Sequence, residues 1–445
     1  MSLTSLPDDL IYDIAKTLSL ECPDDIEKIG RTCARFRCVV WPLVEEHRKA
    51  IKAYSKLDCH SVGAADFFFT ICKKPARASY PRTLEVSANR QLRTLERGST
   101  AKQIALVNAF KAKRDTVSDE DIEAAIARTG LIPQDQTSRW IEGIRAGDED
   151  YLFAILLVSL PKLKRFVIHL DLEKMEVLKE MVRTIDKEWT RRPSLPDLVN
   201  VQVRERDGAR DCDLELLPLL ASIPGVQSLH ASVSQLHPRH PHGSDRRQNL
   251  TGLYRKCFRG DWLSYPGASP SITSVTLETC GMSVEGLEML MQSLYSLKKF
   301  HYVAHRAGWG IHAVSSLLKN SLDSLETLVI STGSGSSRYI GRLKAFTALK
   351  HLTVDTDMLI RDGKMQRFID IMPKSLETCT LAGNSLTKPR ETRLLADMLR
   401  TDVAFPYLRR ISVEDTWGMR NIGQLNINLQ REMYRGAMAR ASRSS

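Results

Sequence analysis

One pattern of apolar and polar positions recurs along the second part of the chain, from about residue 160 onward. Its form is apolar-x-x-apolar-x-apolar, mostly after a Pro or Ser and ahead of a helix-like stretch. The alternation at its end predicts a strand with one buried face, because successive side chains of a strand point to opposite sides. The nine copies are Leu163-Phe166-Ile168, Leu198-Val201-Val203, Val226-Leu229-Ala231, Ile272-Val275-Leu277, Leu297-Phe300-Tyr302, Leu325-Leu328-Ile330, Leu349-Leu352-Val354, Leu376-Cys379-Leu381 and Leu408-Ile411-Val413.

The spacing of the copies indicates a repeat architecture. From the fourth copy onward, consecutive copies are 25, 28, 24, 27 and 32 residues apart. Apolar ladders at helical spacing lie between them, at 287–294, 314–318, 368–372 and 394–399. Strand followed by helix at this period is the logic of an α/β solenoid, and it resembles the leucine-rich repeat family. We therefore expect an irregular horseshoe with strands on its concave face, although Asn384 is the one clear match to the family's Asn ladder.

The strand positions beside the buried ones should face solvent. Each of the nine copies has three such positions, 27 in all, and only four of them are apolar (Val167, Val303, Val329 and Ala382). A sheet buried on both faces would be apolar at most of these positions. We predict that this concave face binds another protein. Its mixed charges suggest no single charge class of target. The candidate target-binding residues are Arg204, His230, Lys299, His301, His351, Asp355 and Arg410.

A second apolar pattern, over residues 6–41, predicts three short helices near the N-terminus. Pro7 suits a first helical position, and Asp8 and Asp9 suit a first turn, where the helix dipole favours carboxylates. So small a unit can bury only a modest core, so Ile11, Val40 and Trp41 should leave apolar surface for a partner. An ordinary helical cap on a larger domain is the alternative. The three apolar stripes are Leu10-Ile14-Leu18, Ile26-Ile29 and Phe36-Val39-Val40-Leu43.

These residues resemble an F-box. The pattern runs Leu3-x-x-Leu6-Pro7-x-x-Leu10-x-x-x-Ile14-x-x-x-Leu18, then Asp25-Ile26 and Ile29, then Cys33-x-Arg35-Phe36-x-x-Val39-Val40. It departs from the family in its longer Leu20–Pro23 connection. The resemblance implies docking onto the Skp-type adaptor of a cullin–RING ubiquitin ligase. The implied adaptor-binding residues are Leu6, Pro7, Leu10, Ile14, Ile26, Val39 and Trp41.

Four regions follow from these patterns, giving an α+β chain overall. They are an F-box domain at 1–50, a helical, basic linker at 51–150, the leucine-rich-repeat solenoid at 151–430, and a basic Ser/Arg tail at 431–445 that we expect to be disordered. In the linker we expect helices at Ile104–Phe110 and at Asp119–Arg128, the latter capped by Ser118. A buried helix over 147–161 should lead into the first repeat, a build that resembles fungal F-box proteins.

The charge of the chain is concentrated in the linker. Residues 73–114 hold eleven basic and two acidic side chains, a net charge of +9, close to the +11 of the chain. Only Tyr80 and Phe110 are aromatic there, and single-stranded nucleic acid is bound through aromatic side chains placed among the basic ones. A solvated connector is therefore favoured over a nucleic-acid site.

Cysteine usage and the absence of long apolar runs predict the compartment. The nine cysteines contain no CxxC pair, which fits free thiols in the cytoplasm or nucleus. Neither a signal segment nor a membrane span is expected. Cys33 and Cys38 are predicted to be small core residues.

The motifs that would carry chemistry are weak. The histidines His237, His240 and His242 lie in a Pro-rich stretch without zinc spacing, and the Gly/Ser-rich segment 331–341 lacks the Lys-Ser/Thr of a phosphate-binding loop. We expect no cofactor, no metal and no catalytic activity.

Together these patterns predict a substrate-recognition subunit of an SCF-type ubiquitin ligase. The F-box would hold the adaptor, and the repeats would bind an unknown protein for ubiquitin-dependent degradation. Two alternatives stay open: a repeat scaffold without a role in degradation, and a nucleic-acid binder that uses residues 73–114.

Overall fold

The computed structural model describes most of the chain, and its parts fall into two compact units, Met1–Arg206 and Asp207–Ser445, which are treated separately here. The described residues are 5–21, 25–87, 101–170, 175–191, 193–205, 216–232, 271–278, 287, 290–291, 294–303, 314–331, 339–361, 364–365, 368–382, 405–414 and 421–426.

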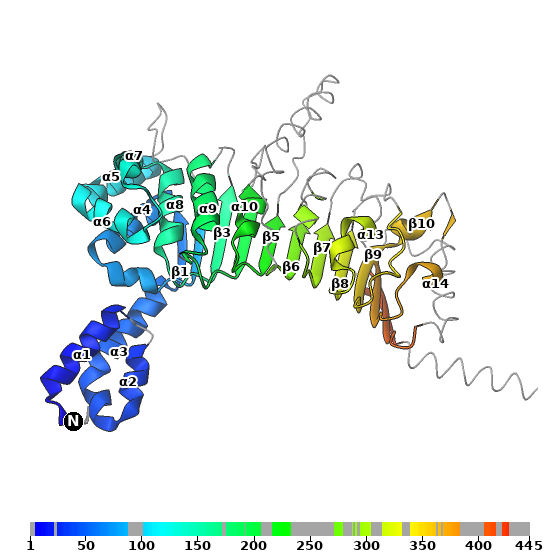
Figure 1. The fold of residues 1–445 in the computed structure, drawn as a ribbon, viewed down its shortest axis with the longest axis horizontal. Helices are drawn as coiled ribbons and strands as arrows, with labels where there is room; N and C mark the ends of the chain where they lie inside the picture. The colour runs from blue at the N-terminus through cyan, green and yellow to red at the C-terminus, as the bar shows by residue number, and fades with distance from the viewer. Residues whose placement is uncertain are drawn as a thin grey trace, which may run out of the picture. The chain divides into compact units, whose positions relative to one another are not determined.

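Unit 1 begins with three helices around a small core of their own (Figure 1). They are α1 (Asp8–Glu21), α2 (Ile26–Thr32) and α3 (Ala34–Tyr54). Gly30 lets α2 lie close to α3, because a Cβ at this position would stand 3.3 Å from a methyl group of Val40. The core residues are Ile11, Ala15, Ile26, Phe36, Val40, Leu43 and Val44.

The rest of unit 1 combines four parallel strands with a cluster of helices. The strands pair in the order β1-β2-β3-β4, and α8 is almost wholly buried. The elements are β1 (Lys56–His60), α4 (Ser61–Lys73), η3 (Pro75–Ser79), β2 (Thr83–Ser87), α5 (Ala101–Arg114), α6 (Asp119–Thr129), η4 (Gln134–Gln136), α7 (Thr137–Ala146), α8 (Glu149–Ser159), β3 (Arg165–Leu170), α9 (Glu176–Glu188) and β4 (Asn200–Glu205).

Two of these strands lie in the range that the sequence analysis assigned to a helical linker. β1 and β2 begin 27 residues apart and follow the same template as the later strands, as Tyr54-x-x-Leu57-x-Cys59 and Pro81-x-x-Leu84-x-Val86. The four strand residues of these templates are buried. Tyr54 and Pro81 occupy the position that Leu, Ile or Val takes in the other copies, which hid the pattern. The repeats therefore begin at β1, not at residue 151.

The helices predicted for this region are confirmed. α6 starts at a capping box, in which the Ser118 hydroxyl accepts a bond from the Asp121 amide (3.2 Å) and the Asp121 carboxylate accepts one from the Ser118 amide (3.3 Å). The helix ends at Gly130 with φ 63°, a left-handed conformation that glycine adopts without cost. α8 is the buried helix expected over 147–161, and the Asp148 side chain caps it.

Unit 2 continues the strand-and-turn pattern (Figure 1). Its strands pair in parallel in the order β5-β6-β7-β8-β9-β12-β13, and β14 adds an antiparallel strand beside β13. The elements are α10 (Leu216–Ser222), β5 (Ser228–Ser232), β6 (Ser274–Glu278), β7 (Lys299–Val303), α13 (Val314–Leu317), η6 (Lys319–Ser321), β8 (Thr327–Ser331), β9 (His351–Asp355), η7 (Thr356–Leu359), β10 (Ile360–Arg361), β11 (Lys364–Met365), α14 (Phe368–Ile371), β12 (Thr378–Ala382), β13 (Arg410–Glu414) and β14 (Asn421–Asn426).

A common backbone arrangement opens the strands of both units. Two consecutive amides at the start of one strand donate to a single carbonyl that precedes the neighbouring strand. In unit 2, Lys298 and Lys299 both bond the Thr273 carbonyl, at 2.8 and 2.9 Å. In unit 1, Arg82 and Thr83 bond the Ser55 carbonyl in the same way, at 2.9 and 3.0 Å. We call this arrangement the shared-carbonyl step; it marks β1 and β2 as members of the same series.

Some predicted features lie outside the described residues. They are Asn384, the ladder at 394–399, the three histidines between 237 and 242, residues 332–338 of the Gly/Ser-rich segment, residues 22–24 of the Leu20–Pro23 connection, and the tail at 431–445.

Candidate protein-binding surfaces

The three-helix unit exposes large apolar side chains. Leu10 is 49% exposed, Ile14 43% and Trp41 42%. Pro7 is exposed as well, whereas Leu6 and Val39 are half-buried against the core. Six of the seven candidate adaptor-binding residues thus retain some exposed surface.

Ile26 does not belong to this surface. Its exposed fraction is 0%, and it packs in the core with residues of α1 and α3. Ile11 and Val40, predicted to be surplus, are core residues too. The stripe of α1 that faces inward is Ile11 and Ala15, and the stripe one residue earlier, Leu10 and Ile14, faces outward. Since α1 is apolar on more than one face, spacing alone did not decide which stripe is buried.

Arg35 joins the starts of α1 and α3 on this surface. Its Nε donates to Asp8 Oδ1 at 2.8 Å, and its Nη2 donates to the Leu6 carbonyl, also at 2.8 Å. These bonds hold the Leu6–Pro7 segment in front of α1. Cys33 is half-buried and accepts a bond from the Phe36 amide at 3.4 Å, and Cys38 is exposed. The prediction that both cysteines are core residues was wrong for Cys38, whereas Cys33 packs against the core and also caps α3.

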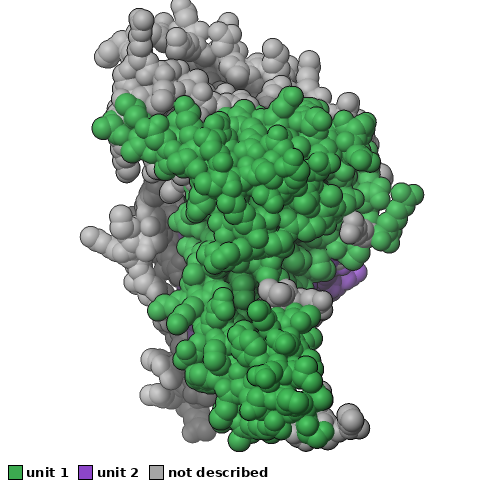
Figure 2. Space-filling model, turned by 90° about the vertical axis from the view of Figure 1, so that its left-hand side faces the viewer, with its two compact units in different colours: residues 1–206 green, residues 207–445 purple. Residues whose placement is uncertain are grey.

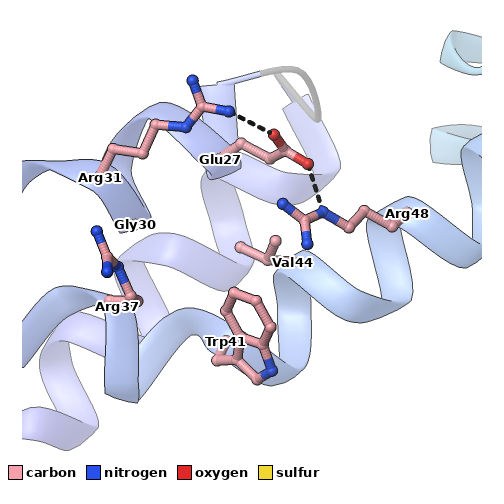
Figure 3. A pocket seen from close by; sticks show the side chains of 7 residues that line it. All are labelled: Glu27, Gly30, Arg31, Arg37, Trp41, Val44 and Arg48. Atoms are coloured by element: carbon pink, nitrogen blue, oxygen red, sulfur yellow. Dashed lines mark hydrogen bonds and ion pairs between the residues drawn. The ribbon is translucent and has the colours of Figure 1, made fainter. Parts of the chain in front are cut away.

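A pocket of about 270 Å³ lies between α2 and α3 next to Trp41 (Figure 3). Glu27 binds Arg48 at 2.7 Å and Arg31 at 3.3 Å, and the hydrogen bond from Arg48 is the main reason that the pKa of Glu27 is lowered. The Arg48 guanidinium stands 5.3 Å from the centre of the Trp41 ring. Three arginines against one glutamate make this pocket basic. The residues that line it are Glu27, Gly30, Arg31, Arg37, Trp41, Val44 and Arg48.

Helix α3 links the three-helix unit to the rest of unit 1. The His47 ring nitrogen lies 3.4 Å from the Tyr80 hydroxyl, and Arg77 donates to the Tyr54 hydroxyl at 2.8 Å. The three helices form the lower lobe of unit 1 in Figure 2. The apolar surface around Trp41 thus lies on a helix that is also anchored in the repeat part of unit 1.

The outward face of the unit 1 strands carries an ion-pair network around Glu85. Glu85 bonds His169 at 2.8 Å and lies 3.7 Å from Lys56 and 3.8 Å from Arg204. The hydrogen bond to His169 is the chief cause that lowers the pKa of Glu85. The candidate Arg204 also donates to Gln202 at 3.0 Å. Glu85 was not predicted as a site residue because β2 was not predicted. The template that starts at Pro81 is the sequence signal that indicates this strand.

The outward face of unit 2 alternates as predicted along β5, β6, β7 and β8. Of its candidates, Lys299, His351 and Arg410 are exposed, and His230 and His301 are half-buried. His230 lies 3.7 Å from Glu278, and a ring nitrogen of His351 lies 2.9 Å from the Thr378 hydroxyl. Burial lowers the pKa of His301, against the opposing pull of Glu278. Histidines thus recur on this face, in the middle of β5 and β7 and at the start of β9.

Asp355 is the candidate that the structure corrects. It is only 5% exposed and accepts a hydrogen bond from the Ser331 hydroxyl at 3.0 Å. Strand β9 runs directly into η7, whose first residue Thr356 is buried as well, so the end of the strand is covered. Val167 and Ala382, also assigned to the solvent face, are buried.

The comparison with protein families fits this geometry. Residues 122–413 match the family model of the leucine-rich repeat domain, more than half of the chain. The chain belongs to the leucine-rich repeat family. No curated protein matches the sequence. The three-helix unit, β1 and β2 precede the matched residues of the leucine-rich repeat domain. A leucine-rich repeat domain indicates a role in protein interaction, through the extended surfaces that such repeats present.

Several basic side chains of residues 73–114 form ion pairs or hydrogen bonds within unit 1. Lys113 pairs with Asp66 at 2.7 Å, and Arg114 pairs with Asp115 at 2.8 Å. Arg82 donates to the carbonyls of Ser79 and Tyr80, at 2.6 and 3.1 Å. These cations hold turns and helices of the leucine-rich repeat protein together. That the 73–114 region does not bind nucleic acid stays a prediction.

The five cysteines among the described residues are free, as expected. Burial raises the pKa of Cys59, Cys72 and Cys379 to about 12, so these thiols are protonated at neutral pH and are poor nucleophiles. Within the described part of the chain, no helix has the length and apolar character that a membrane crossing requires.

Proposed function

We propose that this leucine-rich repeat protein is the substrate-recognition subunit of an SCF-type ubiquitin ligase. The three-helix unit would be an F-box that docks on a Skp-type adaptor, and the repeats would bind the protein to be ubiquitinated. The observation that carries the proposal is the exposure of Leu10, Ile14 and Trp41 on a unit whose core is complete without them. Such surface on a small helical unit favours a protein partner.

Burial of the exposed apolar side chains provides enough free energy for adaptor binding only if the neighbouring residues are buried as well. Full burial of one large apolar side chain contributes roughly 1.5–3 kcal/mol. Association costs about 4–15 kcal/mol in lost translational and rotational freedom. Leu10, Ile14 and Trp41 are already about half buried, so together they can gain only about 2–5 kcal/mol, which reaches no more than the low end of that cost. Pro7, Leu6 and Val39 are therefore needed to extend the interface.

The proposed mechanism needs no catalytic residue in this chain. By holding adaptor and target at once, the chain raises the effective concentration of the target at the ligase. The transfer of ubiquitin belongs to other subunits. A location in the cytoplasm or nucleus, as the free thiols suggest, is part of the proposal.

The test is recovery of the adaptor with the full chain. The double variant Leu10→Asp plus Ile14→Asp places two carboxylates on the exposed stripe, and we expect co-purification of the Skp-type adaptor to be lost. Lys16→Asp is the matched control, since Lys16 is exposed on the same helix but away from the Leu10–Ile14 stripe, and the substitution changes the net charge by the same two units. Equal adaptor recovery from the stripe variant and the wild type would overturn the F-box assignment.

A repeat scaffold without a role in degradation is the second candidate. The two differ in the fate of the protein bound to the repeats: with a receptor, that protein accumulates in cells that carry the stripe variant; with a scaffold, its level is unchanged. The point variant is preferable to deletion of residues 1–48, because that deletion would cut α3 and remove His47, which contacts Tyr80.

A further inference from the structure

We propose that the amino-terminal edge of strands β7 to β13 in unit 2 binds an acidic protein segment that carries two aromatic or apolar anchors. The surface, which we call the basic margin, precedes the strands and is distinct from the outward-facing middle of the sheet. Its two ends are formed by Tyr295, Lys298 and Lys299 and by Tyr407, Arg409 and Arg410, and Lys350 and His351 lie between them.

Basic doublets open alternate strands of this sheet. β7 starts with Lys298-Lys299, β9 with Lys350-His351 and β13 with Arg409-Arg410, and all six side chains are exposed. β8 and β12 lie between them and start with half-buried Glu-Thr pairs. Across the sheet, strands that begin with a basic pair thus alternate with strands that begin with a glutamate.

The shared-carbonyl step keeps the starts of these five strands in line. The amides of each doublet bond the carbonyl that precedes the adjacent strand, for example Lys350 and His351 to Glu326 at 2.9 and 3.0 Å. Neighbouring strands are about 4.8 Å apart, so basic doublets recur roughly every 10 Å. The two outer doublets are about 19 Å apart.

Exposed aromatic side chains accompany the outer doublets. Tyr295 is 56% exposed and Tyr407 58%, and they are the exposed large apolar side chains among the described residues of unit 2. Tyr295 lies three residues before Lys298, and Tyr407 lies two residues before Arg409. A tyrosine ring offers apolar contact area at little entropic cost. Each end of the basic margin therefore combines one apolar anchor with two cations.

These features fit a protein segment with two acidic-aromatic clusters. An extended peptide spans about 20 Å in six residues, close to the separation of the two ends. It can place neutral residues opposite Glu326 and Glu377. A nucleic acid cannot, because its backbone carries a charge at every nucleotide. The inference rests on the proposed role of the repeats in protein binding, but not on the adaptor.

A designed peptide tests the inference on the full-length protein. The probe is fluorescein-labelled Gly-Ser-Asp-Phe-Glu-Gly-Ser-Gly-Asp-Phe-Glu, whose two Phe residues are six positions apart, followed by fluorescence anisotropy at low salt. We expect saturable binding that weakens as salt is added. Arg409→Ser plus Arg410→Ser should weaken it about five- to tenfold, as should Lys298→Ser plus Lys299→Ser, by loss of exposed ion pairs. Arg342→Ser plus Lys344→Ser, two exposed cations between β8 and β9, should leave it unchanged.

Several results would overturn the inference. They are no binding of the two-cluster peptide, the same loss in the Arg342/Lys344 control, equal affinity for a peptide with one cluster, or tighter binding of an oligo-dT strand. Two independent doublet variants guard against the failure of one to fold, which the melting curve reports. Adaptor recovery from the same variants stays at the wild-type level if only the margin is altered, which separates this test from that of the F-box.

Discussion

Leu10 and Ile11 are adjacent in the sequence and have opposite environments. Ile11 is buried in the core of the three helices, and Leu10 is about half exposed. One residue turns a helix by about 100°, so a shift of one position in the reading of a stripe exchanges inside and outside. The resemblance to an F-box placed Leu10 and Ile14 on the outside, whereas the interpretation of the spacing that made Ile11 surplus to the core was wrong.

This contrast gives a paired prediction at the residue scale. Ile11→Ala should destabilise the three-helix unit by about 2–4 kcal/mol, because it leaves a cavity in a small core. Leu10→Ala should change the stability by less than about 1 kcal/mol, because about half of its side chain is already exposed and its loss leaves no core cavity. Hydrogen exchange of peptides from residues 5–54 in the intact protein measures both effects locally. Faster exchange in the Leu10 variant than in the Ile11 variant would mean that the stripes are assigned the wrong way round.

At the scale of elements, one local signal was read correctly, another was missed, and a signal from elsewhere in the chain was not predicted. The cap of α6 is Ser118, the residue directly before the helix, and it was predicted. The cap of α9 comes from α8: the Asp150 carboxylate accepts bonds from the amides of Val177 and Leu178, both at 2.8 Å. No residue near position 176 in the sequence indicates this cap. Likewise, β1 and β2 were missed because Tyr54 and Pro81 replace the aliphatic residue by which the repeats were found.

Asp150 supplies the prediction at this scale. Asp150→Ala leaves two amides at the start of α9 without their acceptor, so we expect a loss of about 1–3 kcal/mol in the free energy of unfolding. Desolvation raises the pKa of this carboxyl, which offsets part of the benefit of the bonds. Asp150→Asn keeps one acceptor oxygen and should have an intermediate effect. Urea denaturation measures all three proteins.

Glu180→Ala is the control for Asp150, because Glu180 is exposed on α9 and caps nothing. A loss as large in Glu180→Ala as in Asp150→Ala would show that α9 tolerates no substitution, whatever the cap.

At the scale of the whole molecule, the boundary of the repeats decides which fragments are stable. The strand order in unit 1 begins at β1, and α8, which precedes β3, packs against α4. A chain that begins at residue 151 lacks β1, β2 and α4. It would expose both the edge of β3 and the buried face of α8, and exposed strand edges promote aggregation.

We therefore expect the full-length chain to be monomeric and residues 151–445 to aggregate. Size-exclusion chromatography with light scattering distinguishes the two. Neither sample contains the adaptor, so adaptor binding does not enter the comparison. A monomeric fragment 151–445 with a cooperative melt would show that β1 and β2 are dispensable additions.

The shared-carbonyl step has a consequence for how such a chain can change. Strands β1 to β4 start at residues 56, 83, 165 and 200, so consecutive starts are 27, 82 and 35 residues apart. Nevertheless β2, β3 and β4 each open with two consecutive amides that donate to one carbonyl. The connection between β2 and β3 contains four helices, α5 to α8, and does not shift the register. Because the shared-carbonyl step and the buried strand residues recur whatever lies between the strands, the length of a connection is free to vary. Whole modules can therefore be gained or lost between strands while the surface that meets the partner stays in place.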